Sequence, residues 1–222
     1  MHSSHIFQQP ISYRYDLYLA ETSKPLIIST HGYGQNKLMA MEFANNIRQD
    51  WSIAALQAPH PHHIHRDGGF EAGFSWVSSY EPQEDVENHH HFIDQVIAHA
   101  GRERSPSANI LFGFSQSVSL NFRYAAHKLT QETNSITAII AVAGAVPSNW
   151  MLTEAARLKN LPVLYICPQE DEAYQHKMTE FKTLLSHHAQ LTWLEFPGRH
   201  RIPSAAYQPI KVWLDEIIAL MP

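Results

Sequence analysis

The stretch Asn109-Ile-Leu-Phe-Gly-Phe-Ser-Gln-Ser117 places Ser115 between an apolar run and a segment of helical periodicity. Gly113 comes two residues before this serine, and Ser117 comes two residues after it. Where a strand turns sharply into a helix, small residues are needed at both places because the strand end and the helix start approach closely. The pattern is therefore typical of a nucleophile elbow, the turn that presents a catalytic serine. The alternative is an ordinary turn in which Ser115 caps the helix.

Short apolar runs alternate with longer stretches of helical period on both sides of this motif. Such alternation is typical of an α/β fold, with a mostly parallel central sheet flanked by helices. The expected strands are an antiparallel one at residues 13–19 and parallel ones at 25–30, 52–57, 109–112, 137–142, 163–167 and 192–196. The expected helices are residues 37–49, 84–99, 116–128, 173–187 and 205–220. Because no repeat or linker interrupts the pattern, we expect residues 1–222 to form a single domain.

The composition limits the classes of function. The chain has 222 residues, 44% of them hydrophobic, which is enough for a full core without metal or disulfide. Its 16 Lys and Arg and 21 Asp and Glu give a net charge of -5, which argues against nucleic acid as a partner. Apolar runs shorter than about 18 residues predict no stable membrane insertion. The start of the chain lacks a signal-peptide pattern and Cys167 is the single cysteine, so we expect a cytoplasmic protein.

A second motif follows an earlier apolar run, where His31-Gly-Tyr-Gly-Gln-Asn36 begins at the end of the expected strand 25–30. Glycines allow backbone N–H groups to point inward, as an oxyanion hole requires. In hydrolases built this way, one donor lies in this loop and the other follows the nucleophile, which predicts the N–H groups of Tyr33 and Gln116. We interpret His31, at the end of a buried strand, as an orienting group rather than a base.

The remaining candidates follow Ser115 in the order acid, then histidine, which is the order found in hydrolases of this type. Three acids, Glu170, Asp171 and Glu172, follow the expected strand 163–167, and His200 follows the expected strand 192–196. Because the carboxyl ends of parallel strands lie at one edge of a sheet, these side chains are expected to meet Ser115.

With these elements the chain resembles the carboxylesterase/phospholipase family of α/β-hydrolases, which includes acyl-protein thioesterases. The resemblance covers nearly the whole chain. Residues 31–36 resemble the family's H-G-x-G-D loop, and residues 113–117 resemble its G-F-S-Q-G elbow. Residues 167–174 resemble its H-G-x-x-D-x-x-V segment, and residues 198–200 resemble its terminal histidine motif. It implies a catalytic triad of Ser115, Asp171 and His200. Asn36, Ser117 and Pro168 depart from the family pattern; Pro168 leaves Glu170 and Glu172 as alternatives for the acid.

The substrate class is inferred from the short segment at residues 144–161, which leaves no room for a large cap domain. A long connection at residues 58–83, which fits no regular element, would partly cover the site. Aromatic residues from it are expected to line an acyl pocket, with core packing as the alternative for each: Phe70, Phe74, Trp76 and Tyr80. Trp150 and Met151 could add to it. We expect hydrolysis of carboxylic esters, or thioesters, with short to medium acyl chains.

The 16 histidines suggest a different interpretation. His60, His62, His63 and His65 lie close together in the chain, which leaves a metal-dependent enzyme as an alternative; without a clear set of carboxylates in register we expect no metal and no cofactor. A non-catalytic binding module that keeps the pocket is the other alternative. The expected partner is a small-molecule acyl ester, and the family resemblance allows a monomer or a homodimer.

Overall fold

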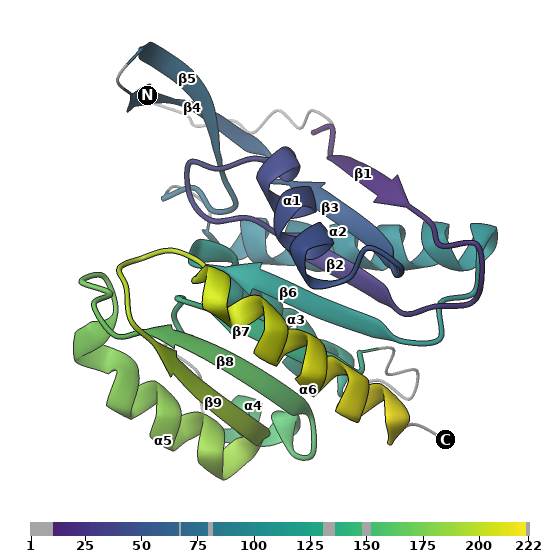
Figure 1. Ribbon diagram of the computed structural model, residues 1–222. Coiled ribbons are helices and arrows are strands. Elements are labelled where there is room, and N and C mark those ends of the chain that lie inside the picture. The colour runs from purple at the N-terminus through teal and green to yellow at the C-terminus, as the bar shows by residue number, and fades with distance from the viewer. Residues whose placement is uncertain (1–10, 67, 80–81, 131–135, 148–151, 221–222) are drawn as a thin grey trace, which may run out of the picture.

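A computed structural model describes residues 11–66, 68–79, 82–130, 136–147 and 152–220. The predicted strands form one seven-stranded sheet in the order β1-β3-β2-β6-β7-β8-β9, in which only β1 is antiparallel (Figure 1). Their bounds are β1 Arg14–Tyr18, β2 Leu26–Thr30, β3 Ser52–Gln57, β6 Asn109–Phe114, β7 Ala138–Val142, β8 Pro162–Pro168 and β9 Gln190–Phe196. The mostly parallel α/β sheet predicted from the sequence is confirmed.

Two apolar cores, one on each face of the sheet, hold the helices in place. Helices α1 (Lys37–Ile47) and α6 (Tyr207–Ala219) pack on one face, in front of the sheet in Figure 1. Helices α2 (Pro82–Glu103), α3 (Gln116–Lys128) and α5 (Met178–His188) contribute to the core on the other face. The helices therefore cover both faces, as the alternation of strands and helices predicts.

The central strand β2 shows why an uninterrupted apolar run predicts a buried parallel strand. All five of its residues are buried, because Leu26 and Ile28 enter one core and Ile27 enters the other. Burial of one such side chain stabilises the fold by roughly 1.5–3 kcal/mol. The neighbours β3 and β6 pair with β2 in parallel register, so the ends of all three strands lie at the same edge of the sheet.

Residues 58–83 differ from the expectation of an irregular connection. They contain a β-hairpin of β4 (His60–Arg66) and β5 (Gly69–Ser75), which forms its own two-stranded sheet and projects from the domain (Figure 1). The prediction failed because β4 is mostly histidine and lacks the alternation of apolar and polar residues that marks a half-buried strand.

The remaining helices are short or begin later than expected. The helix expected at residues 173–187 begins at Met178, after the 3-10 helix η2 (Gln175–Lys177). Between β7 and β8 the described residues form only the short helices α4 (Leu152–Ala155) and η1 (Ala156–Leu158), and a third 3-10 helix, η3 (Ser204–Ala206), precedes α6. None of the described helices has both the length and the apolar character needed to span a membrane.

Candidate active site

The turn between β6 and α3 forces Ser115 into a strained conformation, with φ 56° and ψ -115°. Non-glycine residues with positive φ are uncommon and cluster at functional sites. The turn needs a small residue before it, because a Cβ on Gly113 would lie 2.8 Å from Nδ2 of Asn121. The N–H of Ser115 donates to the carbonyl of Val142 at 2.9 Å, which anchors the turn to β7. This geometry is that of a nucleophile elbow.

Ser117, which stands where the resembled family has glycine, is fully buried and fastens this turn. Its hydroxyl lies 3.0 Å from the carbonyl oxygen of Thr30 and accepts a hydrogen bond from the N–H of Phe114 at 3.1 Å. The serine therefore connects the end of β6 to the end of β2, the two strands that position Ser115 and the 31–36 loop.

The structure brings together the three residues that the sequence singled out at the strand ends. His200 Nε2 lies 2.8 Å from Ser115 Oγ, and His200 Nδ1 lies 2.9 Å from Asp171 Oδ2. Both ring nitrogens are satisfied when Nδ1–H donates to the carboxylate and Nε2 accepts from the serine hydroxyl. A serine activated by a base, which a third group orients, is the arrangement used for nucleophilic catalysis.

Asp171 differs sharply from the two acids beside it. Its side chain is fully buried, and its second oxygen, Oδ1, accepts the N–H of Ala173 at 3.0 Å. Glu170 and Glu172 are exposed and make no described hydrogen bond to His200. Of the three acids in this segment, the geometry therefore favours Asp171 as the partner of His200.

The 31–36 loop leaves the backbone N–H of Tyr33 uncommitted. The N–H of Gly32 donates to Gln35 Oε1 at 2.8 Å, and the N–H of Gly34 donates to the carbonyl of Phe74 at 2.9 Å. Between them, the N–H of Tyr33 has no acceptor among the described residues, and the same is true of the N–H of Gln116 in the first turn of α3. These are the two donors that the sequence predicted for an oxyanion hole.

His31 is buried behind this loop, where its ring contacts two backbone groups and its own carbonyl contacts a tryptophan side chain. Its Nδ1–H donates to the carbonyl of Gly32 at 2.8 Å, its Nε2 accepts the N–H of Ala58 at 3.1 Å, and its own carbonyl accepts Nε1–H of Trp76 at 2.7 Å. Burial lowers the pKa of His31 to about 4, so the ring is neutral at pH 7. These contacts fit an orienting group.

The four aromatic residues expected in an acyl pocket lie in different surroundings. Trp76 is 1% exposed and belongs to the core, whereas Phe70 is 74% exposed near the end of the hairpin and packs against its histidines. Phe74 is half-buried and its backbone bridges the 31–36 loop. Tyr80 lies outside the described residues, as do Trp150 and Met151. Trp76 is therefore a core residue, which was the alternative to a place in the acyl pocket.

The histidines of residues 60–65 do not converge. They alternate along β4, so that His62 stacks on Tyr33 while His63 and His65 pack beside Phe70. His60 is bonded to Asp85 at 2.7 Å. Over the described ranges, no group of three or more His, Cys, Asp or Glu side chains is arranged to hold a metal ion.

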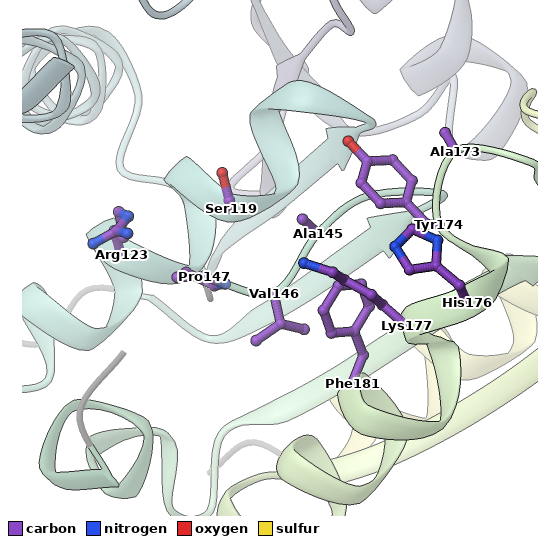
Figure 2. A pocket seen from close by; sticks show the side chains of 10 residues that line it. All are labelled: Ser119, Arg123, Ala145, Val146, Pro147, Ala173, Tyr174, His176, Lys177 and Phe181. Carbon is purple, nitrogen blue, oxygen red and sulfur yellow. The ribbon is translucent and has the colours of Figure 1, made fainter. Parts of the chain in front are cut away.

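A pocket of about 280 Å³, shown in Figure 2, lies on the side of His200 where Tyr174 is found, and the sequence did not predict it. Tyr174 forms one wall, with its ring centroid 5.7 Å from that of His200. Burial raises the pKa of Tyr174, and a hydrogen bond with the side chain of Ser115 opposes this rise. Tyr174 was not predicted as a site residue, because it lies in a segment expected to be an ordinary helix. Its position three residues after Asp171 was the one sequence feature that could have suggested it.

The sheet order, the elbow and the residues at the strand ends define an α/β-hydrolase. The model of the serine hydrolase (FSH1) family matches residues 22–212, so the chain belongs to that family of serine hydrolases. The match includes both strand-end motifs and all three residues of the hydrogen-bonded set.

Solved structures share this fold at low sequence identity. A carboxylesterase from Mesorhizobium loti superposes with a TM-score of 0.73 at 18% identity, covering 93% of this chain and 98% of that one. A carboxylesterase from Bacillus cereus gives 0.67 at 19% identity, with 92% and 94% covered. Acyl-protein thioesterase 2 from Zea mays gives 0.67 at 16% identity, with 92% and 99% covered. The sequence has no match among curated proteins.

Proposed function

We propose that this serine hydrolase cleaves carboxylic ester or thioester bonds through a triad of Ser115, His200 and Asp171. The observation that carries the proposal is the continuous hydrogen-bond chain from Ser115 Oγ through the imidazole to the buried Asp171, at 2.8 Å and 2.9 Å. The strained backbone of Ser115 supports it, since strain of this kind is characteristic of the nucleophile in α/β-hydrolases.

The reaction has two halves. His200 Nε2 takes the proton from Ser115 as the oxygen attacks the acyl carbonyl, and the N–H groups of Tyr33 and Gln116 donate to the developing oxyanion. The protonated imidazole then gives its proton to the departing alcohol or thiol, which leaves an acyl-serine. A water molecule, deprotonated by His200, attacks this ester and releases the acid together with free Ser115. Asp171 stabilises the imidazolium in both halves.

The structural neighbours support the proposed bond class, and the pocket supports the proposed chain length. Carboxylesterases and an acyl-protein thioesterase share the fold, which is consistent with attack on oxygen esters or thioesters. The small, partly open pocket beside the serine favours short to medium acyl chains.

A panel of acyl esters and thioesters of increasing chain length, given to wild type and Ser115→Ala, tests the proposal. We expect wild type to hydrolyse short and medium chains and Ser115→Ala to lose roughly 10⁶-fold in kcat, the scale measured for such nucleophiles. Full activity of Ser115→Ala on any substrate in the panel would overturn the proposed nucleophile. A rate that rises steadily toward long chains would overturn the chain-length proposal alone.

A further inference from the structure

The pocket beside Tyr174 is formed by segments that adjoin the reacting serine. Ser119, in its wall, lies one helical turn after Ser115 on α3. Ala145, also in the wall, follows Gly144. Gly144 packs closely against the nucleophile turn, since a Cβ on it would lie 2.5 Å from the carbonyl oxygen of Ser115. Together with Tyr174, these contacts place the pocket within reach of a group attached to the scissile bond.

The charge of this pocket is opposite to that of the chain. Arg123 reaches it from α3, and His176 and Lys177 reach it from the residues just before α5. No Asp or Glu is among the described residues that line it, although the whole chain carries a net charge of -5. The basic side chains are therefore a local feature and do not reflect the average composition.

Lys177 is the basic residue best placed to meet a ligand. In Figure 2 its side chain extends its amino group toward the side of the pocket formed by Ala145 and Val146. It is half-buried, and in the described part of the chain it forms no ion pair. By contrast, Lys182, further along α5, lies 3.5 Å from a carboxylate oxygen of Glu195 on the protein surface.

Part of the lining is apolar, which limits the chemistry of the ligand. Val146 and Phe181 are among the lining residues and suit a methylene chain. The volume of about 280 Å³ is several times the roughly 30 Å³ that one water molecule occupies in the liquid, so a short chain with a polar end fits.

We propose that this pocket, called here the cationic pocket, binds a carboxylate carried by the substrate of Ser115. The substrate class is then an ester or thioester in which a short methylene chain connects the scissile bond to the carboxylate. The amino group of Lys177 pairs with that carboxylate. This inference rests on the proposed function, because it assigns a specificity to the same nucleophile.

A matched pair of fluorophosphonates tests the inference and does not require the natural substrate. One carries a short alkyl chain ending in carboxylate, and the other carries the same chain ending in ethyl. We expect wild type to react at least about fivefold faster with the carboxylate probe, because one charge pair near a protein surface has an effect of this order. Raising the salt concentration should reduce the ratio, since ions screen such pairs.

Lys177→Met removes the charge and keeps the length of the side chain. We expect it to bring the ratio of the two rates close to one. Lys182→Met, which removes the same charge from the outer side of α5, should keep the wild-type ratio. Equal rates with both probes in wild type would overturn the cationic pocket, as would a ratio that Lys177→Met leaves unchanged.

The two proposals fail in different ways in this experiment. If neither probe modifies Ser115, the proposed nucleophile is wrong and the pocket assignment falls with it. If both probes modify Ser115 at equal rates, only the pocket assignment is wrong. If the carboxylate probe reacts faster, two ester pairs show on which side of the scissile bond the carboxylate lies. Monoethyl glutarate is compared with ethyl hexanoate for the acyl side, and the butanoate ester of 4-hydroxybutanoate with pentyl butanoate for the leaving group. A carboxylate preference in one pair supports the inference, and its absence in both contradicts it.

Discussion

Gly73 of the hairpin lies against Gly34 of the 31–36 loop so closely that a Cβ on Gly73 would be 2.9 Å from the Cα of Gly34. The same contact includes the hydrogen bond from the N–H of Gly34 to the carbonyl of Phe74. The base of the projecting hairpin therefore supports the backbone that presents the N–H of Tyr33.

Substitution of Gly73 by valine should displace the 31–36 loop, because the new Cβ would lie only 2.9 Å from the Cα and 3.0 Å from the carbonyl oxygen of Gly34. We expect kcat/KM to fall by about 10²-fold, the cost associated with a shift of roughly 1 Å at a reacting centre. Steady-state kinetics with a short-chain ester measure the effect. Gly68→Ala on the same hairpin, where nothing lies within 4 Å of the added Cβ, is the matched control and should retain the wild-type rate.

Ser117→Ala should reduce stability, because its hydroxyl is fully buried and bonded to backbone groups of two strands. Leaving buried backbone groups without a partner costs about 1–3 kcal/mol of unfolding free energy. Urea denaturation followed by tryptophan fluorescence measures this loss. Ser119→Ala on the same helix removes only a half-buried hydroxyl with a 3.4 Å contact and should change stability by less than about 0.5 kcal/mol. Equal effects of the two substitutions would contradict the role given to Ser117.

Burial should make the fold sensitive to mild acid through three histidines. It lowers the pKa of His31 and His90 to about 4 and that of His89 to about 3, from an ordinary value of 6.5. Below pH 6.5 the unfolded chain therefore binds more protons than the folded chain, and the free energy of unfolding falls as the pH decreases toward 4. Urea titrations at several pH values between 7.5 and about 4.5 measure how the free energy of unfolding changes with pH.

His89→Leu should make the free energy of unfolding depend less steeply on pH. His91→Leu, which changes an exposed residue of the same helix, should leave this pH dependence unchanged. Stability that stays constant across this pH range in wild type would show that these histidines are protonated as easily in the folded chain as in the unfolded one.

The acid of the proposed triad can be assigned by comparing neighbours. Asp171→Asn should lower kcat by about 10⁴-fold, because the amide no longer holds His200 in the reactive tautomer. Glu170→Gln and Glu172→Gln change exposed carboxylates and should each reduce kcat less than about twofold. A severe loss in either glutamate variant with an active Asp171→Asn would move the assignment to that glutamate.

The sequence predicted the central sheet and the elbow because their signals are local. The strands are short apolar runs such as β2, and the elbow is a five-residue pattern whose small residues follow from the close approach of strand and helix. The meeting of Ser115, Asp171 and His200 also followed from the topology, since parallel strands bring their carboxyl ends to one edge.

The hairpin was missed because its local signal is weak, and the pocket was missed because it joins segments distant in the sequence. The hairpin β4–β5 lacks apolar alternation, and its best signal was the dipeptide Asp67-Gly68, which favours a two-residue hairpin turn. The cationic pocket joins Arg123 on α3 to Lys177 near α5, and neither segment predicts the other. Trp76 looked equally suited to a pocket or a core, and only its hydrogen bond to His31 and its burial decide between them.

The most direct test of the central claim, that Ser115 is the nucleophile, is the intact mass of the protein after treatment with an alkyl fluorophosphonate. We expect one covalent adduct on wild type, mapped by peptide digestion to Ser115, and none on Ser115→Ala. Ser119→Ala, one helical turn away, should be modified like wild type. An unmodified wild-type chain, or an adduct that persists in Ser115→Ala, would contradict the account.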